Sequence, residues 1–426
     1  MKYCAIICEF NPLTHGHEHI IAEAKRLTGK NVIALMSGGF VQRGEMAILD
    51  KYARARLAIG AGCDFVFELP AAFAIAPAQN FASGAIKVLK ELGAVTDLCF
   101  GTECGTIEPL ISIARLLVDA PRDFRRRMKA RLSRGENAHF AQIEELSAAL
   151  PNIDVKAIMS GANNILAIEY LKAIFQQNAN ITPHAILRTD NGYTSTTPRA
   201  NFLGATQIRK SVRKSDFKSI ENFVSADCLT ALKQAPKVDQ TGLNNLILYT
   251  LRTTPASQLN KLFDVTEGLE NLLQNAAKSS VTLNDTIKKC VCKRYREARI
   301  RRLALYAALN LTKSLAKKIA AEPACVKLLA TKHENKPLLS CFASLDTTDE
   351  ANLKSKPPLS SNPRATVIIT NADYNAAQSA SLDFDQKAAN LYAAFSSAPH
   401  AIDRTTGTLF LDRKSTRLNS SHRCIS

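Results

Sequence analysis

The segment Tyr3–His17, YCAIICEFNPLTHGH, joins a short apolar run to a polar turn that contains Pro12 and Gly16. Residues 3–8 form the run, and their β-branched members indicate a buried strand. A helical pattern follows from about residue 16 to residue 27. A strand that passes through such a turn into a helix is the first unit expected of an α/β fold.

The same alternation continues through the first half of the chain. Four more strands are predicted at residues 31–36, 63–69, 97–101 and 184–188, with helical segments between them. Continuous apolar strands that alternate with helices indicate a parallel sheet covered on both faces. We therefore expect an α/β fold with a Rossmann-like parallel sheet, whose ligands bind beyond the carboxyl ends of the strands.

The second half of the chain has a different pattern. From about residue 217 it is mainly helical and basic, and one late apolar run at residues 365–370 is a candidate strand. We place a domain boundary near residues 210–220. Residues 413–426 lack apolar periodicity and look like translated vector sequence, so we expect a non-native or disordered tail.

The composition restricts the class of protein. The chain has 426 residues, of which 46% are hydrophobic, enough to fill large cores. No apolar run reaches the roughly 18 residues of a membrane span, and the first run is too short for a signal peptide. We expect a cytoplasmic protein. The 11 cysteines form no CxxC pair, so we expect reduced thiols and no metal site.

The formal net charge of +17, about +13 without the tail, suggests a polyanionic partner. Basic side chains are dense between residues 288 and 302, where Tyr295 lies among them. Such a surface binds phosphates independently of base sequence, although a solvated basic helix has the same pattern. The cationic residues here are Lys288, Lys289, Lys293, Arg294, Arg296, Arg299, Arg301 and Arg302.

The turn from Asn11 to His17 has the chemistry of a phosphate site. Gly16 allows close backbone approach at a helix start, where free N–H groups and the helix dipole favour phosphate. His17 would point at that phosphate from the first turn, and Thr14 would hydrogen-bond the same oxygens. This arrangement suits attack on an α-phosphate without a covalent enzyme intermediate. The alternative is a helix-capping turn that happens to contain histidine.

This string resembles the His/Thr-x-Gly-His signature of the nucleotidylyltransferase superfamily. Four further segments follow it in order: residues 37–45 (SGGFVQRGE), 64–70 (DFVFELP), 100–103 (FGTE) and 163–170 (NNILAIEY). Together they resemble the tRNA(Met) cytidine acetate ligase family over roughly residues 1–210.

The resemblance implies a two-step reaction. Members of the family make acetyl-adenylate from acetate and ATP, then transfer the acetyl group to the wobble cytidine of elongator tRNA(Met), giving N4-acetylcytidine. ATP and Mg²⁺ are therefore the expected cofactors, and acetate and elongator tRNA(Met) the expected partners, with no membrane. Residues 1–215 would form the nucleotidylyltransferase-like ATP-binding catalytic domain, and residues 216–412 a mainly helical tRNA-binding domain.

The resemblance also implies site residues. His17 and Thr14 would be catalytic. The expected ATP-binding residues are Ile7, Cys8, Glu9, Phe10, Asn11, Pro12, Leu13, Thr14, His15, Gly16, His17, Glu18, His19, Ile20, Gly101, Asn163, Asn164 and Arg188. Arg43, Thr206 and Arg209 are further candidates for phosphate or tRNA contacts. Structural alternatives stay open for three of these residues. Asn163 would then be the N-cap of the following helix, Arg188 a solvated charge at a strand end, and Arg43 the partner of Glu45 or Asp50 in an ion pair.

Two positions depart from the family pattern. Thr14 stands where members commonly have histidine, and Gly204 stands where a serine commonly contacts phosphate. Two other functions therefore stay open. One is a small-molecule adenylyltransferase acting on nicotinate mononucleotide or phosphopantetheine, and the other is a non-enzymatic tRNA-binding protein.

Overall fold

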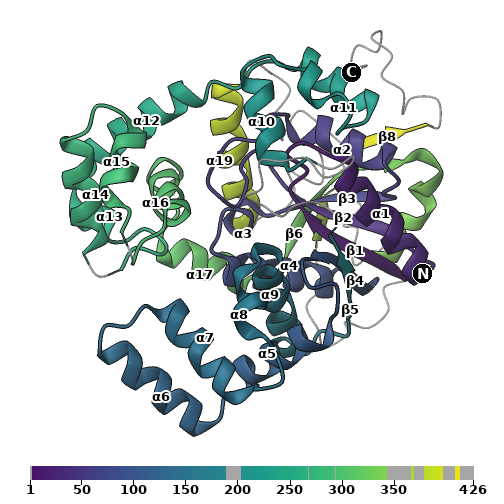
Figure 1. The fold of residues 1–426 in the computed structure, drawn as a ribbon. Helices are drawn as coiled ribbons and strands as arrows, with labels where there is room; N and C mark the ends of the chain where they lie inside the picture. The colour runs from purple at the N-terminus through teal and green to yellow at the C-terminus, as the bar shows by residue number, and fades with distance from the viewer. Residues whose placement is uncertain are drawn as a thin grey trace, which may run out of the picture.

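The computed structural model describes residues 2–188, 203–266, 268–292, 294–342, 366–368, 379–396 and 408–412. Within these residues the centre is an eight-stranded sheet of order β5-β4-β1-β2-β3-β6-β7, and β8 also pairs with β6. Figure 1 shows helices on both sides of it. The strands are β1 Tyr3–Cys8, β2 Asn31–Ser37, β3 Phe65–Leu69, β4 Val95–Thr102, β5 Thr182–Leu187, β6 Cys325–Lys332, β7 Thr366–Ile368 and β8 Leu409–Leu411.

The central strands β1 and β2 are largely apolar because both faces of the sheet are covered. Ile33 and Leu35 of β2 belong to one buried cluster, whereas Val32 and Ala34 belong to the other. Successive side chains of a strand point to opposite faces, so one strand supplies both cores. The pairs β1·β2, β2·β3, β1·β4 and β4·β5 are parallel, which confirms the predicted α/β fold.

Each face of the sheet has its own set of helices. Four helices supply buried side chains to the core that contains Val32: α1 His15–Thr28, α2 Lys51–Gly60, α10 Ala205–Arg213 and α11 Ala226–Gln234. The opposite core receives buried side chains from α3 Ala71–Ala74, α4 Ala78–Glu91, α5 Glu108–Val118, α8 Val155–Ser160, α9 Ala162–Gln176 and α19 Ala380–Phe395, and it continues into the projecting helices described next.

Two groups of helices project from this body (Figure 1). One is a hairpin of α6 Arg122–Ser133 and α7 Ala138–Ala149. The other, here called the helical lobe, consists of α12 Gln240–Thr253, α13 Ala256–Leu259, α14 Leu269–Lys278, α15 Leu283–Cys290, α16 Glu297–Leu309 and α17 Lys313–Ala321. Short 3₁₀ helices lie at Lys218–Ile220 and His333–Cys341. None of the described helices is both long and apolar enough to span a bilayer.

The chain beyond residue 216 is mainly helical, as expected, but it also extends the sheet. Strand β6 pairs antiparallel with β3, so the sheet, which is parallel from β5 to β3, becomes mixed at this edge. The candidate strand at residues 365–370 is confirmed as β7, which pairs with β6. Helix α19 joins the same body, since Tyr392 Oη donates to the Ala47 carbonyl over 2.9 Å. The domain division after residue 215 stays a prediction, and residues 413–426 lie outside the described part.

Candidate active site

A cavity of about 270 Å³ opens where β1 and β4 lie side by side at the carboxyl ends of the strands. The chain leaves β1 toward β2 and leaves β4 toward β5, and these two strands lie on opposite sides of the pair. Loops that diverge in this way leave a crevice in which α/β proteins bind ligands. Residues at the end of β1, the start of α1, the end of β4 and the start of α10 line the cavity.

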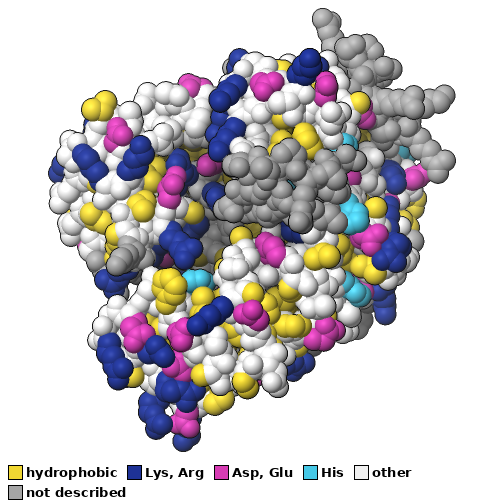
Figure 2. Space-filling view, in the orientation of Figure 1, with side chains coloured by type: hydrophobic (Ala, Val, Ile, Leu, Met, Phe, Trp, Pro, Cys, Tyr) yellow, Lys and Arg dark blue, Asp and Glu magenta, His cyan; other side chains and the backbone are white. Residues whose placement is uncertain are grey.

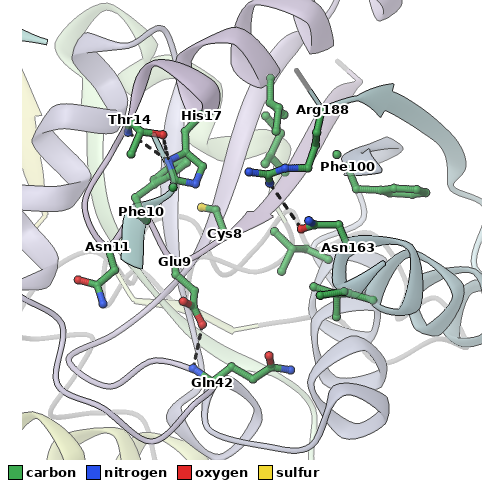
Figure 3. Close-up of a pocket in the computed structure, with 18 of the residues that line it drawn as sticks. Cys8, Glu9, Phe10, Asn11, Thr14, His17, Gln42, Phe100, Asn163 and Arg188 are labelled. Atoms are coloured by element: carbon green, nitrogen blue, oxygen red, sulfur yellow. Dashed lines mark hydrogen bonds between the residues drawn. The ribbon is translucent and has the colours of Figure 1, made fainter. Parts of the chain in front are cut away.

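His17 is held at the start of α1 by its own helix cap. Thr14 is the N-cap residue, and its backbone N–H donates to Nδ1 of His17 over 3.1 Å. Thr14 Oγ1 lies 3.0 Å from the same nitrogen. Because Nδ1 accepts a hydrogen bond, we assign the proton of the neutral ring to Nε2. Figure 3 shows this second nitrogen facing the cavity, where it can donate to a ligand oxygen.

A second helix begins at the same cavity. Helix α10 has Gly204 as its N-cap, and Gly204, Ala205 and Thr206 line the cavity. Arg209 donates from Nη1 to the Asn11 carbonyl over 2.9 Å, which ties α10 to the loop after β1. Two helix N-termini that converge on one space favour an anion there.

Asn11 presents an unpaired donor at this place. Its side chain is 2% exposed, and Oδ1 accepts the Ile48 N–H over 2.9 Å. The Nδ2 group has no hydrogen-bond partner among the described residues. An unpaired buried donor costs about 1–3 kcal/mol, so a ligand oxygen at this position would remove a real penalty.

The opposite side of the cavity is built around Asn163. Its backbone N–H and Nδ2 both donate to Glu103 Oε1, over 3.0 and 2.7 Å. Its Oδ1 lies 3.5 Å from Arg188 Nη1, as Figure 3 shows. The N-cap of α9 is Gly161, so Asn163 is not the helix cap. Glu103 therefore orients Asn163, and Asn163 lies beside Arg188 in the same wall of the cavity.

Gly101 leaves room for a ligand beside Arg188. A Cβ atom at this position would lie 2.9 Å from Cγ of Arg188 and 3.1 Å from Cδ1 of Ile20. We expect Gly101→Ala to displace Arg188 and to raise the Kd for ATP about tenfold, equivalent to about 1.4 kcal/mol. Calorimetric titration with ATP measures this. Gly60→Ala is the matched control, because a Cβ there meets nothing within 4 Å. Equal ATP affinity of the two variants would contradict the assignment.

Arg54 of α2 fixes the loop after β1, and its side chain is fully buried. Its guanidinium donates to the carbonyls of Glu9 (2.6 Å), Ser37 (3.0 Å) and Leu49 (3.1 Å), and also to that of Gly38. These carbonyls belong to the segments that follow β1 and β2 or lead into α2. One side chain therefore holds three backbone segments around the cavity, at the cost of burying a charge.

Burial controls the titratable groups in the cavity wall. It raises the pKa of Glu9, and it raises the pKa values of the Cys8 thiol and the Tyr170 hydroxyl well above their ordinary values. Cys8 therefore stays a neutral thiol and is not a nucleophile at neutral pH. Two aromatic rings pack on Tyr170, those of Phe81 and Phe100. This part of the wall is apolar apart from Glu9.

The structure gathers most of the predicted residues around the cavity. Lining residues among them are Ile7, Cys8, Glu9, Phe10, Asn11, Thr14, His17, Ile20, Arg43, Gly101, Asn163, Arg188, Thr206 and Arg209. The cavity lining does not include Pro12, Leu13, His15, Gly16, Glu18, His19 or Asn164. His15 instead pairs with Glu18, over 2.7 Å.

Asn164 has a structural role and does not line the cavity. It is 2% exposed, and its Oδ1 accepts the backbone N–H groups of Glu103 (2.9 Å) and Cys104 (3.3 Å). Its Nδ2 donates to the Ile158 carbonyl over 3.2 Å. All of its polar groups are thus used inside the protein. The structure assigns Asn164 to holding the loop after β4.

Comparison with known proteins agrees with this geometry. A family model described as HIGH Nucleotidyl Transferase matches residues 1–405. A tRNA(Met) cytidine acetate ligase from Caldanaerobacter subterraneus subsp. tengcongensis is 38% identical over 347 residues, covering 80% of this chain and 85% of the relative. One from Clostridium perfringens is 30% identical over 403 residues, covering 92% of this chain and 95% of the relative.

The chain belongs to the tRNA(Met) cytidine acetate ligase family.

Solved structures of Thermotoga maritima TmcAL have the same fold. The form bound with alpha-thio ATP has a TM-score of 0.83 at 27% identity, and the apo form 0.84 at 26%. Each match covers 97% of this chain and 100% of the other. In this member of the tRNA(Met) cytidine acetate ligase family, Thr14 supplies the helix cap that orients His17.

Two residues that support this site were not identified from the sequence. Glu103 was noticed only as part of a motif, and Arg54 not at all. Glu103 had a signal, since it follows a strand end directly. Arg54 had none, because an arginine in an amphipathic helix is ordinarily exposed. No cluster of three or more His, Cys, Asp or Glu side chains suited to a metal occurs among the described residues.

Proposed function

We propose that this chain is an ATP-dependent tRNA(Met) cytidine acetate ligase. In the first step acetate attacks the α-phosphate of ATP and releases pyrophosphate, and in the second the acetyl group passes to the wobble cytidine of elongator tRNA(Met). The observation that carries the proposal is the orientation of His17, whose Nδ1 is occupied by Thr14 so that Nε2, to which the proton is assigned, faces the cavity. The reaction is placed in the cytoplasm.

The first step needs positioning and charge stabilisation. We place the phosphates between the N-termini of α1 and α10, within reach of His17 Nε2 and Asn11 Nδ2. These donors are fixed before the substrate arrives, so they stabilise the charge that develops on the α-phosphate without reorganising. We place the nucleoside beside Gly101, where Asn163 and Arg188 offer polar groups. Each of these contacts is a proposal.

Magnesium is proposed only as a companion of ATP. Glu9 is the one carboxylate among the residues that line the cavity, so this lining offers no carboxylate cage for Mg²⁺. Mg²⁺ is often held largely by substrate phosphates and water. No catalytic step is assigned to it here.

We propose that the helical lobe binds tRNA through the basic segment at residues 288–302. Figure 2 shows Lys and Arg side chains on this lobe and on the α6–α7 hairpin. Several of the predicted cations have partners within the protein: Lys289 binds Ser279, Arg299 pairs with Asp264, and Arg301 pairs with Glu297. Lys293 lies outside the described residues. Lys288 and Arg296 form no ion pair within the described part of the chain, although Lys288 lies near Asp285, and they are the best candidates for phosphate contacts.

We expect Lys288→Glu and Arg296→Glu each to weaken tRNA binding and to lower the slope of log affinity against log salt by about one. Arg26→Glu is the control, because Arg26 is also exposed but lies on α1, far from the helical lobe (Figure 1). Filter binding at several salt concentrations measures the slope. Equal slopes for all three variants would remove these two residues from the tRNA surface.

Pyrophosphate exchange into ATP tests the proposed first step and separates the other functions. The ligase catalyses acetate-dependent exchange without tRNA. A small-molecule adenylyltransferase would instead exchange only with nicotinate mononucleotide or phosphopantetheine. A non-enzymatic tRNA-binding protein would bind tRNA without binding ATP. Exchange that is independent of acetate would contradict the proposed function.

A further inference from the structure

Glu9 places a carboxylate in the cavity that the first step does not need. It follows β1 directly and lines the same space as His17 and Arg188. A carboxylate beside bound phosphates opposes their binding, since like charges repel. Its presence in this wall therefore indicates a role in another step.

Glu9 is held by hydrogen bonds at its backbone carbonyl and at one oxygen of its carboxylate. Its backbone carbonyl accepts from Nη1 of the buried Arg54, and its Oε1 accepts the Gln42 N–H over 2.9 Å. No hydrogen-bond partner of Oε2 occurs within the described part of the chain. Figure 3 shows the side chain extending from the end of β1 toward the loop that contains Gln42. Glu9 is thus positioned before substrate binds and keeps one oxygen available.

Burial makes Glu9 a stronger base than a solvated glutamate, and the charged groups around it only partly oppose this effect. Burial raises its pKa, while the Gln42 N–H and then Arg209, Arg54 and Arg43 lower it, with burial dominant. Two further neighbours, Cys8 and Tyr170, are kept neutral by burial. A base works best when its pKa approaches the working pH.

We propose that Glu9 is the general base of acetyl transfer, an inference that rests on the proposed function. The N4 amine of cytidine attacks the acetyl carbonyl carbon of acetyl-adenylate, and the new C–N bond forms. The bond from that carbon to the phosphate oxygen breaks, and AMP leaves with the electron pair. The N4 proton moves to Oε2 of Glu9 and afterwards to water. The apolar wall of Phe81, Phe100 and Tyr170 limits competing hydrolysis.

The variant Glu9→Gln separates the two steps, because an amide oxygen still accepts the Gln42 N–H but cannot take up the proton. Acetate-dependent pyrophosphate exchange is expected to stay within about threefold of wild type. Single-turnover transfer from prepared acetyl-adenylate to tRNA(Met) is expected to fall by about 10²–10⁴-fold. Glu23→Gln is the control, because Glu23 lies on α1 outside the cavity lining and pairs with the exposed Arg26. An equal loss of exchange and transfer, or unchanged transfer, would overturn the proposal.

A pH profile of the wild-type protein tests the same role without a variant. The base must be ionised, so the transfer rate falls as pH drops through the pKa of Glu9. Because burial raises that pKa, the fall occurs above the pH at which a solvated glutamate titrates. A rate that stays constant down to about pH 5, close to the pKa of solvated glutamate, would overturn the proposal. Failure of the proposed function would look different, with neither exchange nor acetylation by wild type.

Discussion

His17→Ala is expected to lower the rate of acetate-dependent pyrophosphate exchange by about 10²–10³-fold, the usual loss for one preorganised donor to a developing charge. The reason is the hydrogen bond from the Thr14 backbone to Nδ1, which leaves Nε2–H as the donor toward the α-phosphate. Because this donor acts chiefly in the transition state, we expect the Kd for ATP to change much less than the rate.

His19→Ala is the matched control for this prediction. His19 lies two residues further along α1 but outside the cavity lining, so its loss should leave exchange within about twofold of wild type. Measuring exchange at saturating ATP separates rate from affinity. Equal rates for the two variants would show that His17 is only part of a helix cap.

Arg54→Met is expected to destabilise the fold by about 3–5 kcal/mol, the range for removing one member of a buried polar network. The fully buried guanidinium donates to four carbonyls, and methionine leaves those acceptors without a partner. Arg56→Met, two residues further along α2, is the control and should cost less than about 1 kcal/mol. Urea denaturation measures both. Similar stability of the two variants would contradict the role given to Arg54.

The part of the fold that follows local pattern was predictable from sequence. The strand over residues 3–8 is confirmed without change, and the helix expected from about residue 16 begins at His15, after the Thr14 cap. Apolar runs and turn residues determine such elements within a few neighbours of each position. The motif at the end of β1 also identified the strand end at which the cavity lies.

The remainder depends on contacts between distant segments. Strand β6 pairs with β3 across more than 250 residues of sequence, and no local signal gives that partner or its antiparallel direction. Asn163 and Asn164 are neighbours in sequence, yet successive residues of a helix point about 100° apart, so one faces the cavity and the other the loop after β4. Arg54 gave no signal, because three of its four carbonyl partners, those of Glu9, Ser37 and Gly38, belong to other segments.

Nucleoside analysis of elongator tRNA(Met) after incubation with this protein, ATP and labelled acetate tests the central claim most directly. The expected result is labelled N4-acetylcytidine at the wobble position, formed only when ATP is present and strongly reduced with His17→Ala. Labelled acetate that never enters the tRNA, under conditions in which the protein binds both ATP and tRNA, would contradict the claim.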